Sequence, residues 1–167
     1  VDMELAGLLT LKPAGAQLGA VLLHEILTDL ALSFQAKRIL ASYVQHIQDR
    51  YHTKAGFVTR NFARFTRFCQ DSQLPLKDVV IMAPFNKIGF QMNPSRESCE
   101  ACLSSLTETE VIAMSIMAAG YLNLHAAVAY LRTLSNLSGI AVGVSSLEHA
   151  ERTFTELRTS LLNGRDP

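Results

Sequence analysis

The sequence has no tryptophan, only three cysteines and no surplus of either charge. Lys and Arg together number 15, as do Asp and Glu, so the formal net charge is zero. A nucleic-acid-binding domain usually carries a clustered basic excess, so this balance argues against such a partner. No apolar run is long enough to span a bilayer, and the first residues lack the pattern of a signal peptide. We therefore expect neither nucleic acid nor membrane as a partner.

Cysteine is too scarce to form a disulfide framework or a structural metal site. Three cysteines are an odd number in a chain of this size, which predicts a reducing, cytoplasmic setting. Cys99 and Cys102 form a single Cys-x-x-Cys, and no second pair completes a zinc site. We interpret both as small packing residues on a helix and predict no metal site.

Short motifs that specify a chemistry are also missing. The sequence contains no Gly-rich dinucleotide fingerprint, Walker loop, Gly-x-Ser-x-Gly elbow or His-Glu-x-x-His pair. Candidate functional residues must therefore be inferred from where polar side chains fall along the predicted fold.

What the sequence does contain is a repeated pattern of short apolar runs. Hydrophobic residues make up 49% of its 167 residues and charged residues 18%, which is typical of a globular chain, so we predict a single domain over 1–167. Short continuous apolar runs are typical of strands buried on both faces of a parallel sheet. Five such runs occur, at 20–24, 55–59, 78–83, 110–115 and 139–144.

Helical patterns separate these runs. Ser33 is expected to cap a helix whose inward positions run from Ala36 to Ile47 and include Ile39 and Tyr43. Asn61 is expected to open the next helix, the pair Asn93-Pro94 to begin the third, and Asn123 to cap the fourth. The last helix is expected to turn four residues inward, namely Ala150, Phe154, Leu157 and Leu161.

Strands that alternate with amphipathic helices about every 30 residues predict βα units and a parallel sheet. The predicted fold is therefore α/β, a partial TIM-type barrel with about five C-terminal βα units over residues 20–162. Residues 1–19 are expected to hold a remnant helix near Met3–Leu9 and a loop. A closed barrel needs eight strands, so the exposed barrel edges predict a homo-oligomer. An open doubly wound sheet is the structural alternative.

Ligands of parallel α/β folds bind beyond the C-terminal ends of the strands. Polar residues follow all five predicted strands, and we expect them to converge on one pocket for a small-molecule substrate. The candidates, in chain order, are His24, Arg60, Asn61, Asn86, Lys87, Ser115, Ser145 and Ser146.

Each candidate has a chemical role and a structural alternative. Ser145 and Ser146 stand before a helix, where free N–H groups hold phosphate, but Ser145 and Glu148 also have the spacing of a simple capping box. His24 is either a proton donor to a carbonyl or a partly buried histidine. Arg60 and Lys87 either bind an anion, with Asn86 beside them in a long loop, or are solvated surface residues.

The order of these strand ends resembles the C-terminal part of the aldo-keto reductase superfamily. Leu22-Leu23-His24 followed by Asp29 is similar to that family's fourth strand and its active-site histidine. The later motifs similar to the family are, in order, Gly56–Phe62, Pro84-Phe85-Asn86, Val111–Ser115 with Gly120, and Gly143–His149.

This resemblance implies hydride transfer from a nicotinamide cofactor, NADP, to a carbonyl. It implies that His24 polarises the carbonyl, that Asn61 and Ser115 contact the cofactor, and that Ser145 and Ser146 meet its phosphates. The family's catalytic Asp, Tyr and Lys lie in earlier units that these residues do not include. The resemblance thus implies a cofactor-binding part that does not reduce carbonyls alone.

Two other functions remain open at this stage. One is a TIM-barrel lyase or hydrolase that acts on a phosphorylated or carboxylated metabolite, with Arg60 and Lys87 as anchors. The other is a truncated barrel without catalysis that only binds a ligand or a partner subunit.

Overall fold

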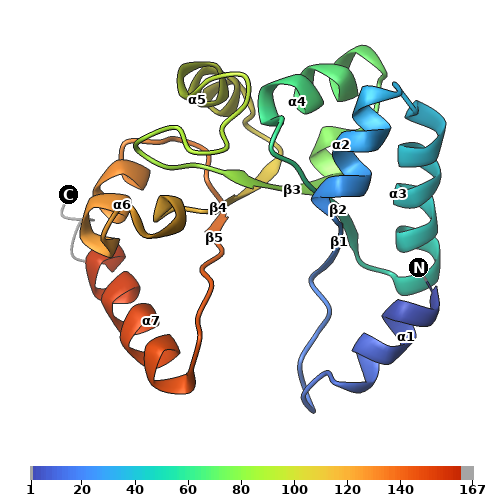
Figure 1. Ribbon diagram of the computed structural model, residues 1–167. Helices are drawn as coiled ribbons and strands as arrows, with labels where there is room; N and C mark the ends of the chain where they lie inside the picture. Colours follow the sequence, from blue (N-terminus) through green and yellow to red (C-terminus); the bar gives the residue numbers. More distant parts are fainter. Residues whose placement is uncertain (1, 163–167) are drawn as a thin grey trace.

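Five parallel strands form one sheet in the computed structural model, which describes residues 2–162 (Figure 1). The strands pair in sequence order, and every neighbouring pair is parallel. This arrangement confirms the α/β prediction and its alternating βα units, and the sheet is that of a partial (β/α) barrel. The strands are β1 (Ala20–Leu23), β2 (Lys54–Val58), β3 (Val79–Pro84), β4 (Glu110–Met114) and β5 (Gly139–Ile140).

Helices connect successive strands and lie around the sheet, so that the chain forms an arch (Figure 1). None of the helices within residues 2–162 is long and apolar enough to cross a membrane. In chain order the helices are α1 (Asp2–Thr10), α2 (Glu25–Ser33), α3 (Lys37–Tyr51), α4 (Phe62–Asp71), α5 (Arg96–Ser105), α6 (Leu124–Leu131) and α7 (Leu147–Leu162), with 3-10 turns η1 (Leu76–Asp78) and η2 (Ala118–Gly120).

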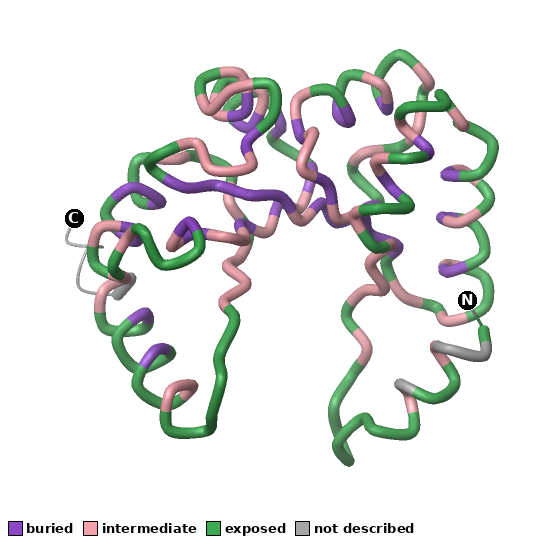
Figure 2. The backbone as a smooth tube through the Cα atoms, in the orientation of Figure 1, coloured by how far each residue is buried: buried purple, intermediate pink, exposed green. Residues whose placement is uncertain are grey.

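The helices cover one face of the sheet. Successive residues of a strand point to opposite faces, and one alternate set joins the buried core. On β3 this set is Val79, Ile81 and Ala83, and it packs with helix residues such as Leu40 and Leu103. The buried parts of the chain accordingly lie where helices meet strands (Figure 2). The hydrophobic core is therefore the layer between the sheet and the helices.

Aromatic rings make up the centre of this layer. The Phe57 ring of β2 lies 5.0 Å from the Phe65 ring of α4, and the Phe62 and Phe85 rings lie 5.2 Å apart, edge to face. All four side chains are almost completely buried. Tilted and edge-to-face pairs are worth about 0.5–1.5 kcal/mol each beyond the burial of their area. Helix α4 is thus held in place by its rings Phe62 and Phe65.

The other face of the sheet is apolar and includes several half-buried residues. It carries the second alternate set of strand residues, which stay outside the core cluster, and we call it the concave face. Its half-buried members are Leu22, Val58, Met82, Ile112 and Met114. In a closed barrel this face forms the packed interior.

Several predicted helix starts are wrong by a few residues. Ser33 is the last residue of α2, a helix that the sequence pattern did not predict. Its hydroxyl donates to the Asp29 carbonyl within α2 and does not cap the following helix. Helix α3 begins at Lys37 instead. Ser95, not Asn93, caps α5 through a 3.2 Å bond from the Ser98 amide. Asn61 and Asn123 do precede α4 and α6 as predicted.

Two predicted inward residues face solvent. Ile39 on α3 is 64% exposed, whereas Leu40, Val44 and Ile47 form its buried stripe. Phe154 on α7 is 52% exposed because Thr153, one residue earlier, takes the buried position. Ala150 and Leu157 do lie inward, and the side chain of Leu161 lies outside the described residues.

Gly56 is required by the spacing of the sheet. A methyl group there would lie 2.8 Å from the Val80 carbonyl oxygen and 3.0 Å from the Leu22 side chain. Gly56→Ala should therefore lower the free energy of unfolding by about 1–3 kcal/mol, as overpacking does. Gly139→Ala is the matched control, because its methyl group meets Ile112 at an ordinary 3.7 Å. Chemical denaturation of both variants tests this, and equal losses would contradict it.

Candidate functional site

The C-terminal ends of the five strands lie at one edge of the sheet and carry the predicted site residues. The structure divides these residues between separate places along that edge. His24, Arg60 and Asn61 belong to the exits of β1 and β2, and Ser115, Ser145 and Ser146 to those of β4 and β5. Strands lie about 4.8 Å apart, so β1 and β4 are separated by about 14 Å along the sheet.

Asp29 organises the exits of β1 and β2. Its carboxylate accepts a hydrogen bond from the Thr59 hydroxyl and a second, 3.2 Å long, from the Arg60 amide. The buried Thr59 hydroxyl in turn accepts a 2.9 Å bond from the Asn61 amide. The partners of Asp29 thus belong to the exit of β2. The carboxylate therefore ties α2 to the start of α4.

Arg60 is engaged within the chain. Its guanidinium makes a two-pronged contact with the Glu25 carboxylate, in which Nε donates a 3.0 Å bond to Oε2 and Nη2 donates to Oε1. Bidentate pairs of this kind are among the strongest charge-assisted hydrogen bonds. Arg60, which the sequence predicts as an anion-binding residue, is thus paired with the Glu25 carboxylate, 35 residues away in the chain.

His24 caps α2 with its side chain. The Nδ1 atom accepts a 3.2 Å hydrogen bond from the Ile26 amide, and the residue is exposed. In a neutral imidazole whose Nδ1 accepts, the hydrogen-bond network assigns the proton to Nε2. The ring therefore caps the helix through Nδ1 and has an N–H donor at Nε2 on an exposed residue.

The two candidate asparagines and Lys87 do not share one pocket. Asn86 is completely buried, and its amide closes the loop after β3 by donating to the Phe90 carbonyl and accepting from the Phe90 amide, each at 2.8 Å. Lys87 follows it and is exposed. Asn61 lines a hollow of about 490 Å³ on the outer side of the sheet, between α2 and α4, together with Arg64 and Arg67.

A cavity of about 630 Å³ lies at the exits of β4 and β5. Ser115 lies in its wall, and the apolar part of the wall comes from Met114, Met117 and Val142. The loop after β3 contributes Phe90 and Gln91, two residues that the strand-end argument passed over. The length of this loop could have identified them as candidates, because binding residues are often found in loops at strand exits.

The loop after β4 is strained where it lines this cavity. Ser115, Ala118 and Ala119 have φ values of 52°, 48° and 57°, in the left-handed region. This conformation costs an L-residue about 1–2 kcal/mol. Strained backbone of this kind gathers at functional sites, so the loop marks the cavity as a candidate binding site.

The start of α7 follows the cavity wall closely in the chain. Gly143 lines the cavity wall, and two residues later Ser145 and Ser146 precede the helix. Ser146 is the capping residue, because its hydroxyl accepts a 3.1 Å bond from the His149 amide, so the predicted capping box of Ser145 and Glu148 is wrong by one residue. The Ser145 hydroxyl lies 3.1 Å from Nδ1 of His149. Both serines are exposed.

The cysteines take packing positions. Cys99 and Cys102 lie on α5, as predicted, and Cys102 lies 2.8 Å from the Thr66 hydroxyl of α4. Burial raises the pKa of Cys69 to about 12 and that of Cys99 to about 11. Within residues 2–162, no three histidine, cysteine or acidic side chains are grouped closely enough to hold a metal ion.

The three thiols should therefore react at very different rates with a disulfide reagent at pH 8. With a pKa near 11, roughly one Cys99 thiol in a thousand is ionised at that pH, and only the thiolate reacts. We expect one faster thiol, the half-buried Cys102, and a Cys102→Ser variant that lacks this phase. Unfolding in guanidinium should make all three equal. Rapid reaction of Cys69 in the folded protein would contradict the buried core around α4.

The comparisons with known proteins assign no family to this chain. A scan against protein-family models and searches of curated proteins and of solved structures found no match. The resemblance to aldo-keto reductases therefore remains a hypothesis that depends on the order of the strand-end motifs. The structural features that bear on function are the cavity at β4 and β5, the start of α7 and the residues around them.

Proposed function

We propose that this chain binds a phosphate-bearing nucleotide, NADP in the first place, at the exits of β4 and β5. The observation that carries the proposal is that Ala141, Val142 and Gly143 line the 630 Å³ cavity and that Ser145 and Ser146 follow directly in the chain, at the start of α7. One loop, residues 141–146, supplies both the cavity wall and the two exposed hydroxyls. A ligand with an apolar, planar part and a phosphate matches this combination.

The phosphate is proposed to lie at the start of α7. A helix of 16 residues has free amide groups and a partial positive charge at its first turn, both of which favour an anion. The Ser145 and Ser146 hydroxyls add donors from the same side. Because both are exposed, a phosphate can reach them without unfolding the loop.

The remainder of the nucleotide is proposed to occupy the cavity. Met114, Met117 and Val142 offer apolar contact to a flat ring, and Ser115 offers a hydroxyl. A dinucleotide crosses several strand exits when it binds at the edge of a parallel sheet. It can therefore extend from α7 toward β1, where His24 stands.

The chemistry that a bound NADP supplies is hydride transfer to a carbonyl. In this proposal His24 donates the Nε2 proton as a hydrogen bond to the carbonyl oxygen, since its Nδ1 is already held by the Ile26 amide. The chain contributes cofactor binding and carbonyl polarisation to a carbonyl-reducing oxidoreductase.

The alternative function, a lyase or hydrolase acting on a phosphorylated or carboxylated metabolite, uses the same start of α7. It also requires free cationic anchors at the strand ends. The pairing of Arg60 with Glu25 removes one of the two anchors that the sequence suggested, and this favours the nucleotide.

Calorimetric titration with NADP tests the proposal. Ser146→Asp keeps a helix-capping side chain, because aspartate caps as well as serine, but it places a negative charge where the phosphate is expected. We expect the Kd for NADP to rise at least about tenfold, which corresponds to about 1.4 kcal/mol. Ser95→Asp is the matched control, because it makes the same exchange at the capping residue of α5 and should leave the Kd unchanged.

Two outcomes would overturn the proposal. The first is no NADP binding at millimolar concentration by the folded protein. The second is binding that Ser146→Asp leaves intact, which would place the nucleotide elsewhere. Binding of inorganic phosphate without NADP would support the phosphorylated-metabolite alternative instead.

A further inference from the structure

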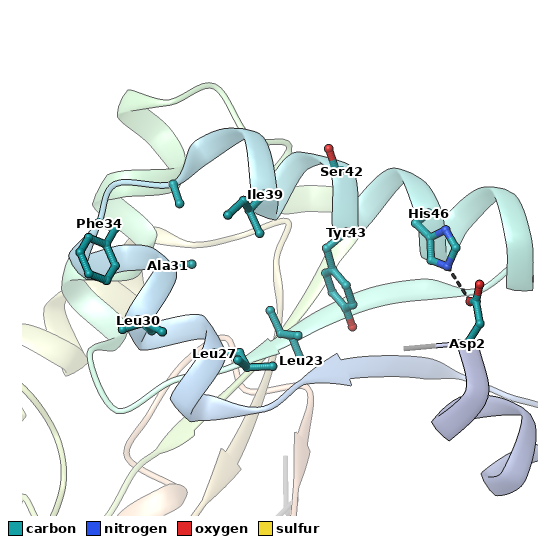
Figure 3. Close-up of a pocket in the computed structure, with 11 residues that line it drawn as sticks. Asp2, Leu23, Leu27, Leu30, Ala31, Phe34, Ile39, Ser42, Tyr43 and His46 are labelled. Carbon is teal, nitrogen blue, oxygen red and sulfur yellow. Dashed lines mark hydrogen bonds and ion pairs between the residues drawn. The ribbon is translucent and has the colours of Figure 1, made fainter.

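An apolar groove runs between α2 and α3 at the β1 end of the sheet (Figure 3). Its volume is about 850 Å³, and its wall is almost entirely hydrophobic. Phe34 is 76% exposed in this groove and Ile39 is 64% exposed, while Leu27 and Leu30 are about half exposed. A single exposed leucine is ordinary, but a contiguous apolar patch of this kind marks an interaction surface.

The groove lies where a βα fold places a helix. In such a fold the helix between two strands packs over both of them. The floor of the groove includes Leu23 of β1, and β1 is the first strand in the order of the sheet. Among the described residues of α1, only Asp2 lines the groove, where it bonds His46 at one end. The position next to β1 thus has a strand edge with no neighbouring strand within residues 2–162 and, between α2 and α3, a hollow whose wall includes Asp2 of α1.

The opposite end of the sheet carries the complementary elements. Strand β5 is last in the order, and α7 follows it. Leu147 and Phe154 on α7 are 76% and 52% exposed. They are seven residues apart, which is two helical turns, so they lie on one stripe of the helix. The chain therefore has an apolar helix stripe at one end of its sheet and an apolar groove at the other.

We propose that a second copy of this chain binds head to tail, with its α7 in the α2–α3 groove and its β5 beside β1. Leu147 and Phe154 of the copy then cover Leu30, Phe34 and Ile39. The same contact formed twice, about a twofold axis parallel to the strands, preserves the direction of every strand and closes the ring. Two sheets of five strands then form one parallel barrel of ten strands, two more than a TIM barrel has, and the concave face becomes its interior.

A second copy is favoured over an unrelated partner because one closure accounts for three separate features. It gives the edge of β1 a parallel strand, it fills the groove with a helix, and it covers the half-buried concave residues. Unpaired strand edges and apolar faces of this kind are otherwise liabilities for a protein in water.

Sedimentation velocity over a range of concentrations tests the proposal. We expect a dimer for the wild type and, at the same concentration, a monomer for both Ile39→Glu and Phe154→Glu. Both positions are more than half exposed, so the monomers should keep the wild-type circular dichroism spectrum and unfolding midpoint. Tyr121→Glu is the matched control, because Tyr121 is 82% exposed on the loop after β4 and should leave the dimer intact.

Mixing the two monomeric variants separates a head-to-tail contact from a symmetric one. In the mixture, the wild-type groove of Phe154→Glu can receive the wild-type α7 of Ile39→Glu, so one of the two contacts is restored and a mixed dimer should form. A dimer made by pairing groove with groove would not recover in this way.

Three results would overturn the proposal. The first is a wild-type monomer up to concentrations on the order of 100 μM, which is the range of a weak interface. The second is a dimer that survives Ile39→Glu or Phe154→Glu. The third is a mixture of the two variants that stays monomeric. None of them depends on NADP, so this proposal and the proposed function can fail separately.

Discussion

Parallel pairing of β2, β3 and β4 is the constraint on which the rest of the structure depends. Because all strands run in one direction, each must be followed by a connection that returns to the opposite end of the sheet, and helices provide it. These helices bury Phe57, Ile81 and Val111 on one side and leave Met82 and Ile112 half exposed on the other. The same parallel order brings every strand exit to one edge. The core, the concave face and the candidate site are therefore three consequences of one pairing pattern.

The residues at the strand exits differ between the two ends of the sheet. At β1 and β2, the charged residues already have partners within the chain, since Glu25 pairs with Arg60 and Asp29 accepts a hydrogen bond from the Thr59 hydroxyl. This network fixes the start of α4 and leaves little free charge for a ligand. At β4 and β5 the chain instead offers an apolar hollow and, at the start of α7, two exposed hydroxyls whose partner is His149. The contrast explains why the candidate site lies toward the last strands, although the sequence places polar residues after all five.

The sequence predicts the layers of this fold far better than the partners of its side chains. Continuous apolar runs such as 78–83 identify strands because both of their faces are covered to some extent, and the stripe of Phe62, Phe65 and Cys69 identifies α4. Helix α2 was not predicted, and two of its leucines, Leu27 and Leu30, line the groove instead of joining the core. The pairing of Arg60 with Glu25 joins residues 35 positions apart, so no local pattern reveals it. Asn86 has the residue type of a ligand group, and only its complete burial shows that it holds the loop.

The left-handed loop at residues 115–120 has a consequence for how the cavity meets a ligand. The left-handed φ values of Ser115, Ala118 and Ala119 are part of the folded backbone, so their conformational cost is borne when the chain folds. The wall of the cavity is then preorganised, and little backbone entropy remains to be lost when a molecule enters it. Replacing this loop with a relaxed one would give a more stable chain and a less sharply defined cavity wall.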